Sequence, residues 1–431
     1  MIKNKVVKNS MWIISCKVAQ SVLAVIINML TARYLGPSNY GLINYAASIV
    51  AFVIPIMQLG LNAILVQEII NKPEKEGETL GTSLVMSLIS AFLCIIGVLL
   101  FSLIANAGET ETIIVCFLYS ILLIFSALEL TQYWFQAKLM SKYVSLTMLL
   151  AYILVSGYKI FLLATGKNIY WFAISNALDY AIISVVLLII YKKISKNKLS
   201  FSLTTAKSLF NKGKYYIVSS MMVTIFAQTA RIMLKFMISN EAVGYYSAAV
   251  ACAGMTSFVF TAIIDSFRPL IFESKKNSQQ VFEKNVTRLY SVIIYFALAQ
   301  SVFIAVFSEV IVKILYGSQY IDSVMALRII VWHTTFSYLG AVRNIWILAE
   351  GKHKILWVLN LSGALFNIIL NFVFIPIWGI YGAALSALLT QIFTNVVLGF
   401  IIKPIKDNNK LMLQALNVKN LIEIIMRQTQ K

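Results

Sequence analysis

The sequence predicts an all-α integral membrane protein with twelve transmembrane helices, arranged as two six-helix bundles related by a pseudo-two-fold axis along the membrane normal. The 431 residues are 60% hydrophobic and only 12% charged, whereas soluble domains carry about 25% charged residues. Long apolar runs follow one another along the whole chain. The hydrophilic segments between them alternate between basic and nearly uncharged. A chain with this much apolar surface is expected to be embedded in a lipid bilayer.

Each apolar run is long enough to cross the hydrocarbon core, for which a helix needs about 20 residues. Because lipid offers no partner for free backbone N–H and C=O groups, each run is expected to be helical. The twelve predicted spans are 11–33, 41–66, 81–105, 113–135, 143–165, 169–191, 215–238, 245–267, 289–315, 324–349, 355–375 and 380–402. The first is expected to be a retained span, because it is too long for a signal peptide and lacks an A-x-A cleavage site.

The distribution of basic residues predicts the topology. Seven hydrophilic segments hold 27 of the 36 Lys and Arg, and the six segments between them hold only Lys167. The seven basic segments are 1–10, 67–80, 136–142, 192–214, 268–288, 350–354 and 403–431. Short basic loops stay cytoplasmic, so both termini are expected in the cytoplasm. The net charge of +19 follows from this topology and from contact with anionic lipids, and no nucleic acid is expected as a partner.

The longest hydrophilic interruption, 192–214, lies near the midpoint and contains seven Lys. A weak repeat at an offset of 203 aligns Gly41 with Gly244 and Ala46 with Ala249. Six spans in each half make such a duplication parallel, with an axis along the membrane normal. The predicted domains are an N-terminal bundle over 1–191, a basic linker over 192–214, a C-terminal bundle over 215–402 and a basic tail over 403–431.

The sequence lacks the motifs that several classes of protein function require. The segment 106–112 carries Glu109 and Glu111, and the other uncharged loops are of turn length, so an enzyme working on a large outer loop is disfavoured. No segment has the Gly-rich phosphate-binding motif of ATPases. The four Cys all lie inside apolar runs, and the two His are not paired. No metal ion and no cofactor are therefore expected.

Four segments resemble those of a known transporter family. The first is LTARYLGPSNYG over 30–41, in which Gly36-Pro37 ends a helix and turns the chain. The others are ELTQYWFQ over 129–136, VGYYSAA over 243–249 and WGIYGAA over 378–384. Together they resemble the polysaccharide repeat-unit flippases, the O-antigen and capsule transporters of the multidrug/oligosaccharidyl-lipid/polysaccharide (MOP) exporter superfamily. The resemblance extends over essentially the whole chain.

The resemblance implies a transporter, not an enzyme, that moves an undecaprenyl-diphosphate-linked oligosaccharide from the cytoplasmic to the outer leaflet. It implies alternating access through a central cavity between two bundles, in a bacterial cytoplasmic (inner) membrane. Other membrane proteins of polysaccharide assembly would be candidate partners.

Charged residues inside the spans are candidates for substrate contact, because a charge at the bilayer centre costs about 2.5–3.5 kcal/mol and usually faces a cavity or a partner. Arginine and lysine could bind the diphosphate, and asparagine could bind the sugars. The candidates for substrate binding are Lys17, Arg33, Lys159, Arg231, Lys235, Arg328, Arg343, Asn360 and Asn367. At the offset of 203, Asn28 aligns with Arg231.

Simpler explanations stay open for many of these residues. Arg33, Lys235 and Lys313 lie near a predicted membrane surface, where their long side chains can reach water. Glu309 lies four residues before Lys313, so the two could form an ion pair on one helix. Asn360, Asn367 and Asn371 form a polar stripe on one predicted span. Hydrogen bonds between helices explain such a stripe about as well as sugar contacts do.

Asp179 is the only acid predicted deep in the membrane. It is the candidate for coupling transport to protons or sodium ions, and membrane potential is a second candidate energy source. A structural pair with Lys159 on the neighbouring span is the alternative. A multidrug antiporter of the same superfamily would be expected to show mainly acids at depth, whereas bases prevail here. A non-transporting scaffold would leave the deep charges unexplained.

Overall fold

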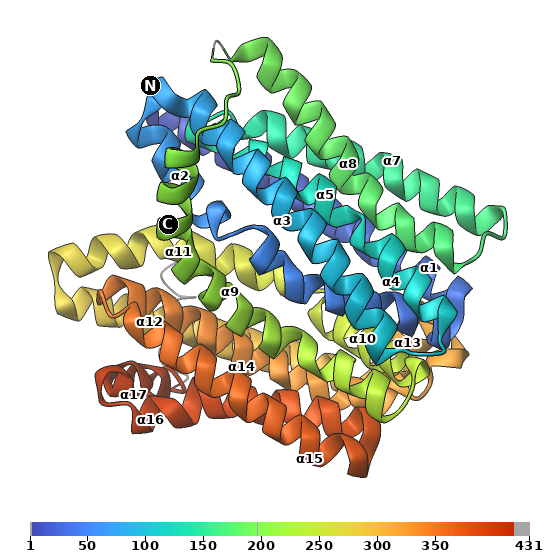
Figure 1. The fold of residues 1–431 in the computed structure, drawn as a ribbon. Helices are drawn as coiled ribbons and strands as arrows, with labels where there is room; N and C mark the ends of the chain where they lie inside the picture. Colours follow the sequence, from blue (N-terminus) through green and yellow to red (C-terminus); the bar gives the residue numbers. More distant parts are fainter. Residues whose placement is uncertain (1, 196, 418–431) are drawn as a thin grey trace. The chain divides into compact units, whose positions relative to one another are not determined.

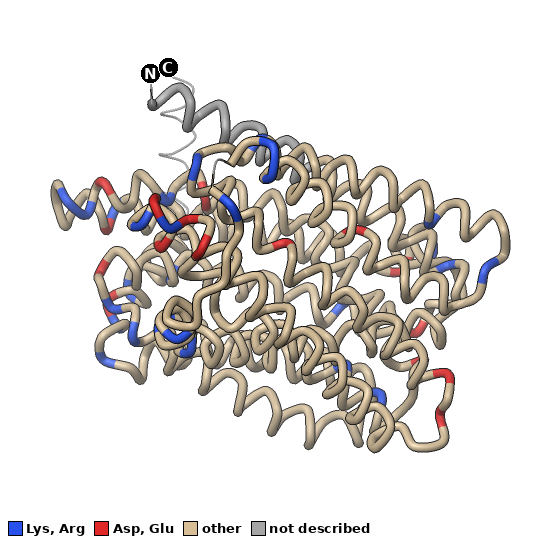
Figure 2. The backbone as a smooth tube through the Cα atoms, turned by 45° about the horizontal axis from the view of Figure 1, so that its top comes forward, with Lys and Arg blue, Asp and Glu red and all other residues tan. Residues whose placement is uncertain are grey.

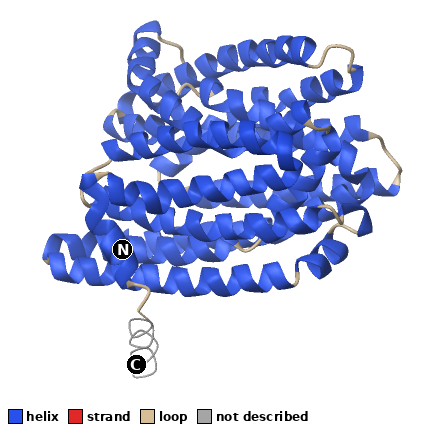
Figure 3. Ribbon diagram, turned by 90° about the horizontal axis from the view of Figure 1, so that it is seen from below, coloured by secondary structure: helices blue, strands red, loops and turns tan. Residues whose placement is uncertain are grey.

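The computed structural model describes the backbone of residues 2–195 and 197–417, and the side chains of that part from Ala19 onward. The described chain is almost entirely helical and contains no strand (Figure 3). This confirms the predicted all-α class. The chain divides into two compact units, Met1–Gln228 and Thr229–Lys431.

The helices of the first unit follow one another with short connections (Figure 1). They are α1 (Ile2–Met57), α2 (Leu61–Asn71), α3 (Glu76–Ala105), α4 (Thr110–Ser120), α5 (Leu122–Leu128), α6 (Gln132–Ala137), α7 (Ser141–Ala164), α8 (Ile169–Ile194) and the first part of α9 (Leu203–Met237). Short 3₁₀ turns lie at Pro73–Lys75 and Glu129–Thr131.

The second unit contains the rest of α9 and eight further helices. They are α10 (Asn240–Gly254), α11 (Ser257–Asn277), α12 (Gln279–Val306), α13 (Ser308–Leu315), α14 (Ser323–Ala349), α15 (Lys354–Ile392), α16 (Leu398–Ile401) and α17 (Lys406–Gln414). A π-helical turn at Phe393–Val397 joins α15 to α16. Two 3₁₀ turns lie at Ser318–Tyr320 and Lys403–Ile405.

The boundary between the units lies inside α9, not in the predicted linker over 192–214. The linker and the first part of α9 are bound to the first unit. Lys212 Nζ lies 2.5 Å from Glu68 Oε1. A Cβ atom added at Gly60 would come within 2.2 Å of the Gly213 carbonyl oxygen, so the two backbones touch. The segment therefore belongs to the packed part of the first unit.

Two long helical stretches double back at a glycine. Asn367 in α15 donates a hydrogen bond of 3.2 Å to Thr390 Oγ1, although a straight helix would separate these residues by about 35 Å. Gly379 between them has a backbone φ of 55°, which favours glycine. Gly36 in α1, with φ 72°, interrupts that helix in the same way. Each stretch is thus a pair of helices that contact each other.

The loops of the first unit gather in two groups, as the alternation of charge predicts. At one end, Glu76 at the start of α3 lies 2.5 Å from Lys138 Nζ and accepts a hydrogen bond from Asn197. At the opposite ends of these helices, Tyr45 and Asn106 share a hydrogen bond, and Tyr34 donates one to the carbonyl of Lys167. The basic loops are therefore together, and the uncharged loops are together.

The second unit repeats this arrangement. At its basic end, Lys275 Nζ lies 2.5 Å from Glu350 Oε1, and Lys352 donates to the carbonyl of Pro404. The other end joins residues 238–245 to Asp322 and to residues 378–381 around a shallow pocket. Figure 2 shows charged positions concentrated at helix ends and sparse along the helices.

The helices are long and apolar enough for a multi-pass membrane protein. Eight helical stretches of the described residues could cross a membrane, or nine if α10 and α11, bent by 43° at their junction, form one span. Two of the eight, Ala19–Asn71 and Lys354–Ile401, are the stretches that double back. The tenth predicted span forms α14 but is not among them. Large apolar side chains point outward along these helices, with Ile104 81% and Phe372 66% exposed, as expected for contact with lipid.

Candidate functional site

A polar cavity of about 260 Å³ lies inside the first unit, among α1, α4, α7 and α8. Its walls carry two charged residues, Lys159 and Asp179. Uncharged polar groups complete the lining: Asn28, Thr31, Tyr40, Asn44, Tyr119, Tyr152, Ser156 and Asn176. Polar side chains at this density inside a lipid-facing helical bundle are costly and usually functional.

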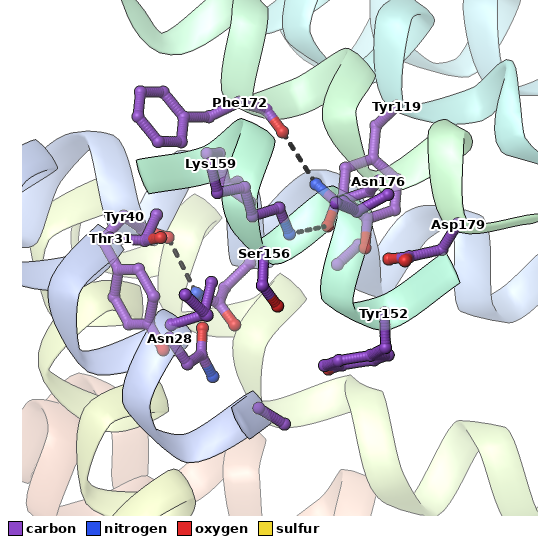
Figure 4. Close-up of a pocket in the computed structure, with 16 residues that line it drawn as sticks. Asn28, Thr31, Tyr40, Tyr119, Tyr152, Ser156, Lys159, Phe172, Asn176 and Asp179 are labelled. Atoms are coloured by element: carbon purple, nitrogen blue, oxygen red, sulfur yellow. Dashed lines mark hydrogen bonds between the residues drawn. The ribbon is translucent and has the colours of Figure 1, made fainter. Parts of the chain in front are cut away.

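Lys159, Asn176 and Asp179 point toward the same space (Figure 4). The ammonium of Lys159 donates a hydrogen bond of 3.2 Å to Asn176 Oδ1. The amide of Asn176 in turn donates to the carbonyl of Phe172 at 2.9 Å, one helical turn earlier, which fixes the orientation of this side chain. Asn176 therefore presents its oxygen to the lysine.

Asp179 stands beside this pair without joining it. Its Oδ1 atom is buried and has no hydrogen-bond partner among the residues that the structure describes. The predicted structural pair with Lys159 is not formed, because the lysine donates to Asn176 instead. An unpartnered buried carboxylate oxygen is costly, so this atom is available to a proton, a cation or a substrate hydroxyl.

The opposite wall of the cavity comes from the two segments of α1 on either side of Gly36. Asn28 and Thr31 precede the break, and Tyr40 and Asn44 follow it. Asn44 donates to the carbonyl of Tyr40 at 2.8 Å. In a straight helix Asn28 and Asn44 would be about 24 Å apart, so the break at Gly36 is what brings them to one cavity.

The cavity combines donors and acceptors with equal numbers of opposite charges. Hydroxyl and amide groups suit hydrogen bonds to sugar hydroxyls or to the shell of a hydrated ion. Its volume is below the range of about 300–1,000 Å³ typical of sites for drug-sized ligands. It therefore fits one small polar group or ion, not a complete oligosaccharide.

In the second unit, the positions that align with two of the cavity residues contact each other. Arg231, which aligns with Asn28, donates from Nε to Ser247 Oγ at 3.0 Å. At the same offset of 203, Ser247 aligns with Asn44. The pair of positions that shares a cavity in the first unit is thus in direct contact in the second. This agreement supports the duplication.

The other basic candidates lie in different surroundings. The side chain of Lys17 is outside the described residues. Arg33 is exposed near the break in α1, and Lys235 is partly buried one turn after Arg231 on α9. Exposed Arg328 donates from Nε to Ser308 Oγ at 2.9 Å. Arg33, Lys235 and Arg328 are not among the residues that line the cavity of the first unit.

The ion pair expected between Glu309 and Lys313 is present, with Lys313 Nζ 2.6 Å from Glu309 Oε1. Both side chains are about half exposed. This confirms the helical pair as the arrangement of these two residues.

Arg343 is buried in the core of the second unit, with only 5% of its surface exposed. Its Nη1 donates to the carbonyl of Thr394, a residue of the π-helical turn. This hydrogen bond joins α14 to the π-helical turn. Its surroundings are packed apolar residues such as Val342 and Trp346.

The asparagines of α15 hydrogen-bond with one another and across the helix pair. Asn367 donates to Thr390, and Asn371 donates to Asn367 at 2.8 Å. Both asparagines are buried. Their contacts are therefore hydrogen bonds within the helix pair, as expected if the polar stripe holds helices together. Asn360, about two helical turns before Asn367, is partly buried.

Most of the cavity was not predicted from the sequence. Lys159 and Asp179 were candidates, but Asn44, Asn176, Tyr152 and the neighbouring hydroxyls were not. A signal was present on α7 and α8. Tyr152, Ser156 and Lys159 are spaced four and three residues apart, and Asn176 and Asp179 three apart, so each set shares a helix face.

No group of three or more His, Cys, Asp or Glu residues that could hold a metal ion is found among the described residues. Cys94, Cys116 and Cys252 are buried.

The chain matches a sequence family and several relatives. The model of the family described as "Polysaccharide biosynthesis protein" matches residues 6–275. An uncharacterized membrane protein of Methanocaldococcus jannaschii is 27% identical over 51% of this chain and 46% of that protein, so the match spans about half of that relative. The probable low-salt glycan biosynthesis flippase Agl15 of Haloferax volcanii is 22% identical over 85% of this chain and 77% of its own length. The capsular polysaccharide biosynthesis protein CapF of Staphylococcus aureus is 21% identical over 89% of this chain and 96% of its own length.

Solved structures share the fold. The lipid II flippase MurJ, in an inward closed conformation, has a TM-score of 0.72 at 17% identity, covering 96% of this chain and 93% of its own. An inward-facing multidrug transporter of the MATE family has a TM-score of 0.66 at 14% identity, and the match covers 90% of this chain and 96% of the transporter. Both comparisons confirm the resemblance noted in the sequence. The chain therefore belongs to the polysaccharide biosynthesis protein family and has the fold of the MOP superfamily flippases and transporters.

Proposed function

We propose that this protein is a flippase that moves an undecaprenyl-diphosphate-linked oligosaccharide from the cytoplasmic to the outer leaflet. One observation carries the proposal: within a chain of this family, an otherwise apolar bundle encloses a cavity with a lysine, a buried unpartnered carboxylate oxygen and many hydroxyl and amide groups. A relative named as a glycan biosynthesis flippase and another named for capsular polysaccharide support the substrate class.

In this proposal the chain crosses the membrane twelve times. The stretches broken at Gly36 and Gly379 each supply two spans, α10 and α11 together supply one, and α14 supplies another. Both termini then lie in the cytoplasm, since the basic loops share one end of each unit. The protein would work in the bacterial cytoplasmic (inner) membrane, where other proteins of polysaccharide assembly are candidate partners.

The cavity of the first unit would serve as a subsite for the passing headgroup or for the coupling ion. Lys159 would attract phosphate oxygens, and the amide and hydroxyl groups would hydrogen-bond to sugars. Asp179 would bind a proton or sodium ion, because its buried oxygen lacks a partner. Arg231, Arg328 and the other basic candidates outside the packed core would contribute along the rest of the path.

A multidrug exporter of the same superfamily is the second candidate, favoured by the similar fold of the MATE transporter. It would be expected to accept organic cations. The cavity holds one base and one acid, which suits a polar substrate of mixed character better than a simple cation.

The test is reconstitution of the purified protein in vesicles that carry the lipid-linked oligosaccharide on one leaflet only. A membrane-impermeant glycosidase then reports how much of the sugar reaches the other leaflet. The flippase proposal predicts protein-dependent cleavage, with no protein-dependent transport of an organic cation dye. Dye transport without sugar translocation would establish the multidrug alternative instead.

A further inference from the structure

A second cavity, of about 580 Å³, lies at the basic end of the second unit between α12 and α17. One face of α12 supplies Gln280, Glu283, Lys284, Thr287 and Arg288, which occupy positions i, i+3, i+4, i+7 and i+8 of the helix. The end of α17 and the residues after it supply Leu411, Leu413, Gln414 and Asn417. Neither the sequence pattern nor the proposed transport path assigns a role to this cavity.

The two walls of this cavity are held together by hydrogen bonds. Tyr290 donates to Asn408 Oδ1 at 2.9 Å, and Ser291 donates to the carbonyl of Ala415 at 2.9 Å. Farther along α12, Tyr295 donates to the carbonyl of Leu416 at 2.7 Å. The Asn409 amide also donates to the carbonyl of Val396 at 2.8 Å. Hydrogen bonds therefore fix α17 against α12, and the cavity between them is a defined part of the fold.

The cationic groups of this cavity lack anionic partners. Arg288 Nη2 is buried and has no hydrogen-bond partner among the described residues. In that part of the chain neither Arg288 nor Lys284 forms an ion pair. The nearest acid of the lining, Glu283, accepts a hydrogen bond of 2.7 Å from Gln279.

This arrangement is unfavourable while the cavity holds no anion. Lys284 and Arg288 are four residues apart on one helix, where like charges repel. A buried guanidinium nitrogen without a partner also loses the hydration that it would have in water. A bound anion would remove both costs.

The rim of the cavity indicates which anion fits. Leu413, which lines the cavity, is apolar and 47% exposed. Leu416, three residues farther along the chain, is 54% exposed. Apolar side chains beside a cationic hollow match a molecule with a charged head and hydrocarbon chains. The hollow also lies at the basic end of the unit, which also contains Lys275 and Lys352.

We propose that this cavity binds the phosphate of an anionic phospholipid headgroup. Arg288 presents its planar guanidinium to two phosphate oxygens, Lys284 adds a point charge, and Thr287 offers a hydroxyl donor. The acyl chains of the lipid lie against Leu413 and Leu416. The bound lipid joins α12 to α17 at the membrane surface. The site is independent of what the protein transports.

The experiment measures lipid binding to the full-length protein in mild detergent by native mass spectrometry. Dioleoyl-phosphatidylglycerol is titrated against wild type and Arg288→Gln, and dioleoyl-phosphatidylcholine serves as the zwitterionic comparison. We expect Arg288→Gln to weaken phosphatidylglycerol binding about tenfold, the effect of losing one charge-assisted hydrogen bond. Phosphatidylcholine should bind weakly to both proteins.

Lys410→Gln is the matched control. It removes one positive charge from α17 at the same end of the unit, but Lys410 already pairs with Asp407 at 3.0 Å and does not line the cavity. Binding of phosphatidylglycerol to this variant should equal that of wild type. Equal losses in Arg288→Gln and Lys410→Gln would mean that only overall charge matters, and the proposed site would be overturned.

Two further measurements keep the test decisive. Arg288→Lys retains the charge and the fold but loses the planar guanidinium that can bind two phosphate oxygens. It should therefore weaken phosphatidylglycerol binding severalfold. Binding at the wild-type level in both Arg288→Lys and Arg288→Gln would contradict the site. Calorimetry with inorganic phosphate separates the two sources of phosphate. Tight binding of inorganic phosphate that depends on Arg288, with phosphatidylglycerol binding unaffected, would assign the cavity to a soluble anion and overturn the lipid.

Discussion

At the scale of single residues, the cavity of the first unit depends on how three side chains share their hydrogen bonds. Lys159 is satisfied by Asn176, which leaves an oxygen of Asp179 buried without a partner. Had lysine and aspartate formed an ion pair, the two charges would have cancelled and the cavity would be inert. The observed arrangement keeps the carboxylate available for a ligand.

The first prediction concerns ion coupling at Asp179. The change Asp179→Asn keeps the shape but removes the group that could bind a proton or cation. We expect uptake driven by a pH or sodium gradient in vesicles to lose its dependence on the gradient, with exchange without a gradient largely retained. The measurement compares translocation rates with and without each imposed gradient. Full gradient dependence in Asp179→Asn would remove this residue from the coupling mechanism.

The second prediction concerns Arg343, which was expected to bind substrate but lies in a packed core. Its guanidinium satisfies the carbonyl of Thr394 in the π-turn. Arg343→Ala should destabilise the protein by about 1.5–3 kcal/mol, the effect of losing a hydrogen bond to a charged group. Thermal unfolding in detergent should show this as a clear drop in Tm.

Arg328→Ala provides the comparison for Arg343. Arg328 is also an arginine of α14, but its side chain is exposed and its Nε donates to a serine hydroxyl. This change should alter stability by less than about 1 kcal/mol. If Arg343→Ala unfolds at the same temperature as Arg328→Ala, Arg343 has no structural role at the π-turn, and substrate binding becomes the better explanation.

At the scale of elements, glycines determine where the long apolar stretches reverse. In α15 the reversal at Gly379 brings Gly382 against the backbone of Phe374, where an added Cβ would lie 2.1 Å from the carbonyl oxygen. Only glycine permits this approach. The sequence predicts two spans there, 355–375 and 380–402, and the close approach at Gly382 lets the two helices pack against each other.

The third prediction tests this helix pair with Gly382→Ala. The added methyl group should force the two segments of α15 apart and destabilise the protein by about 1–3 kcal/mol. Gly97→Ala in α3 is the control, because an added Cβ there meets no atom within 4 Å. That change should be neutral or stabilise by up to about 1 kcal/mol. Denaturation of the two variants in parallel gives the comparison, and equal stabilities would argue against the close approach at Gly382.

The helices could be predicted from the sequence, but the hydrogen-bond partners of the buried polar side chains could not. Runs of apolar residues predicted the helices because lipid leaves the backbone no alternative. The break at Gly36 was predicted from Gly36-Pro37. In contrast, the π-turn at Phe393–Val397 and the use of Arg343 to satisfy it depend on packing between α14 and α15. Nothing in the local sequence indicates such a contact.

At the scale of the whole molecule, the alternation of charge in the loops predicted which loops share an end of each unit. The pairs Glu76–Lys138 and Lys275–Glu350 lie at the basic ends, and Tyr45–Asn106 lies at an uncharged end. The repeat aligns Asn28 with Arg231. Asn28 lines the cavity of the first unit, whereas Arg231 donates a hydrogen bond to Ser247 in the second. The cavity itself was missed because it forms only when four helices meet.

The fourth prediction concerns topology. In a variant lacking the native cysteines, Glu111→Cys should react with a membrane-impermeant maleimide added outside intact cells, since Glu111 is exposed in the first turn of α4, at the end of the first unit opposite the basic loops. Lys142→Cys and Lys276→Cys, exposed at the basic ends, should react only after the membrane is permeabilised. Labelling of all three from outside would contradict the twelve-span arrangement with cytoplasmic basic loops.

The most direct measurement of the central claim is the initial rate of sugar translocation in vesicles for wild type, Lys159→Gln and Lys167→Gln. Both variants remove one lysine from the first unit, but Lys159 lines the cavity whereas Lys167 is exposed in a loop. If the cavity contacts the anionic headgroup, Lys159→Gln should slow translocation at least tenfold, the effect of about 1.4 kcal/mol, and Lys167→Gln should match wild type. Wild-type rates in both variants would contradict a role for the cavity in transport.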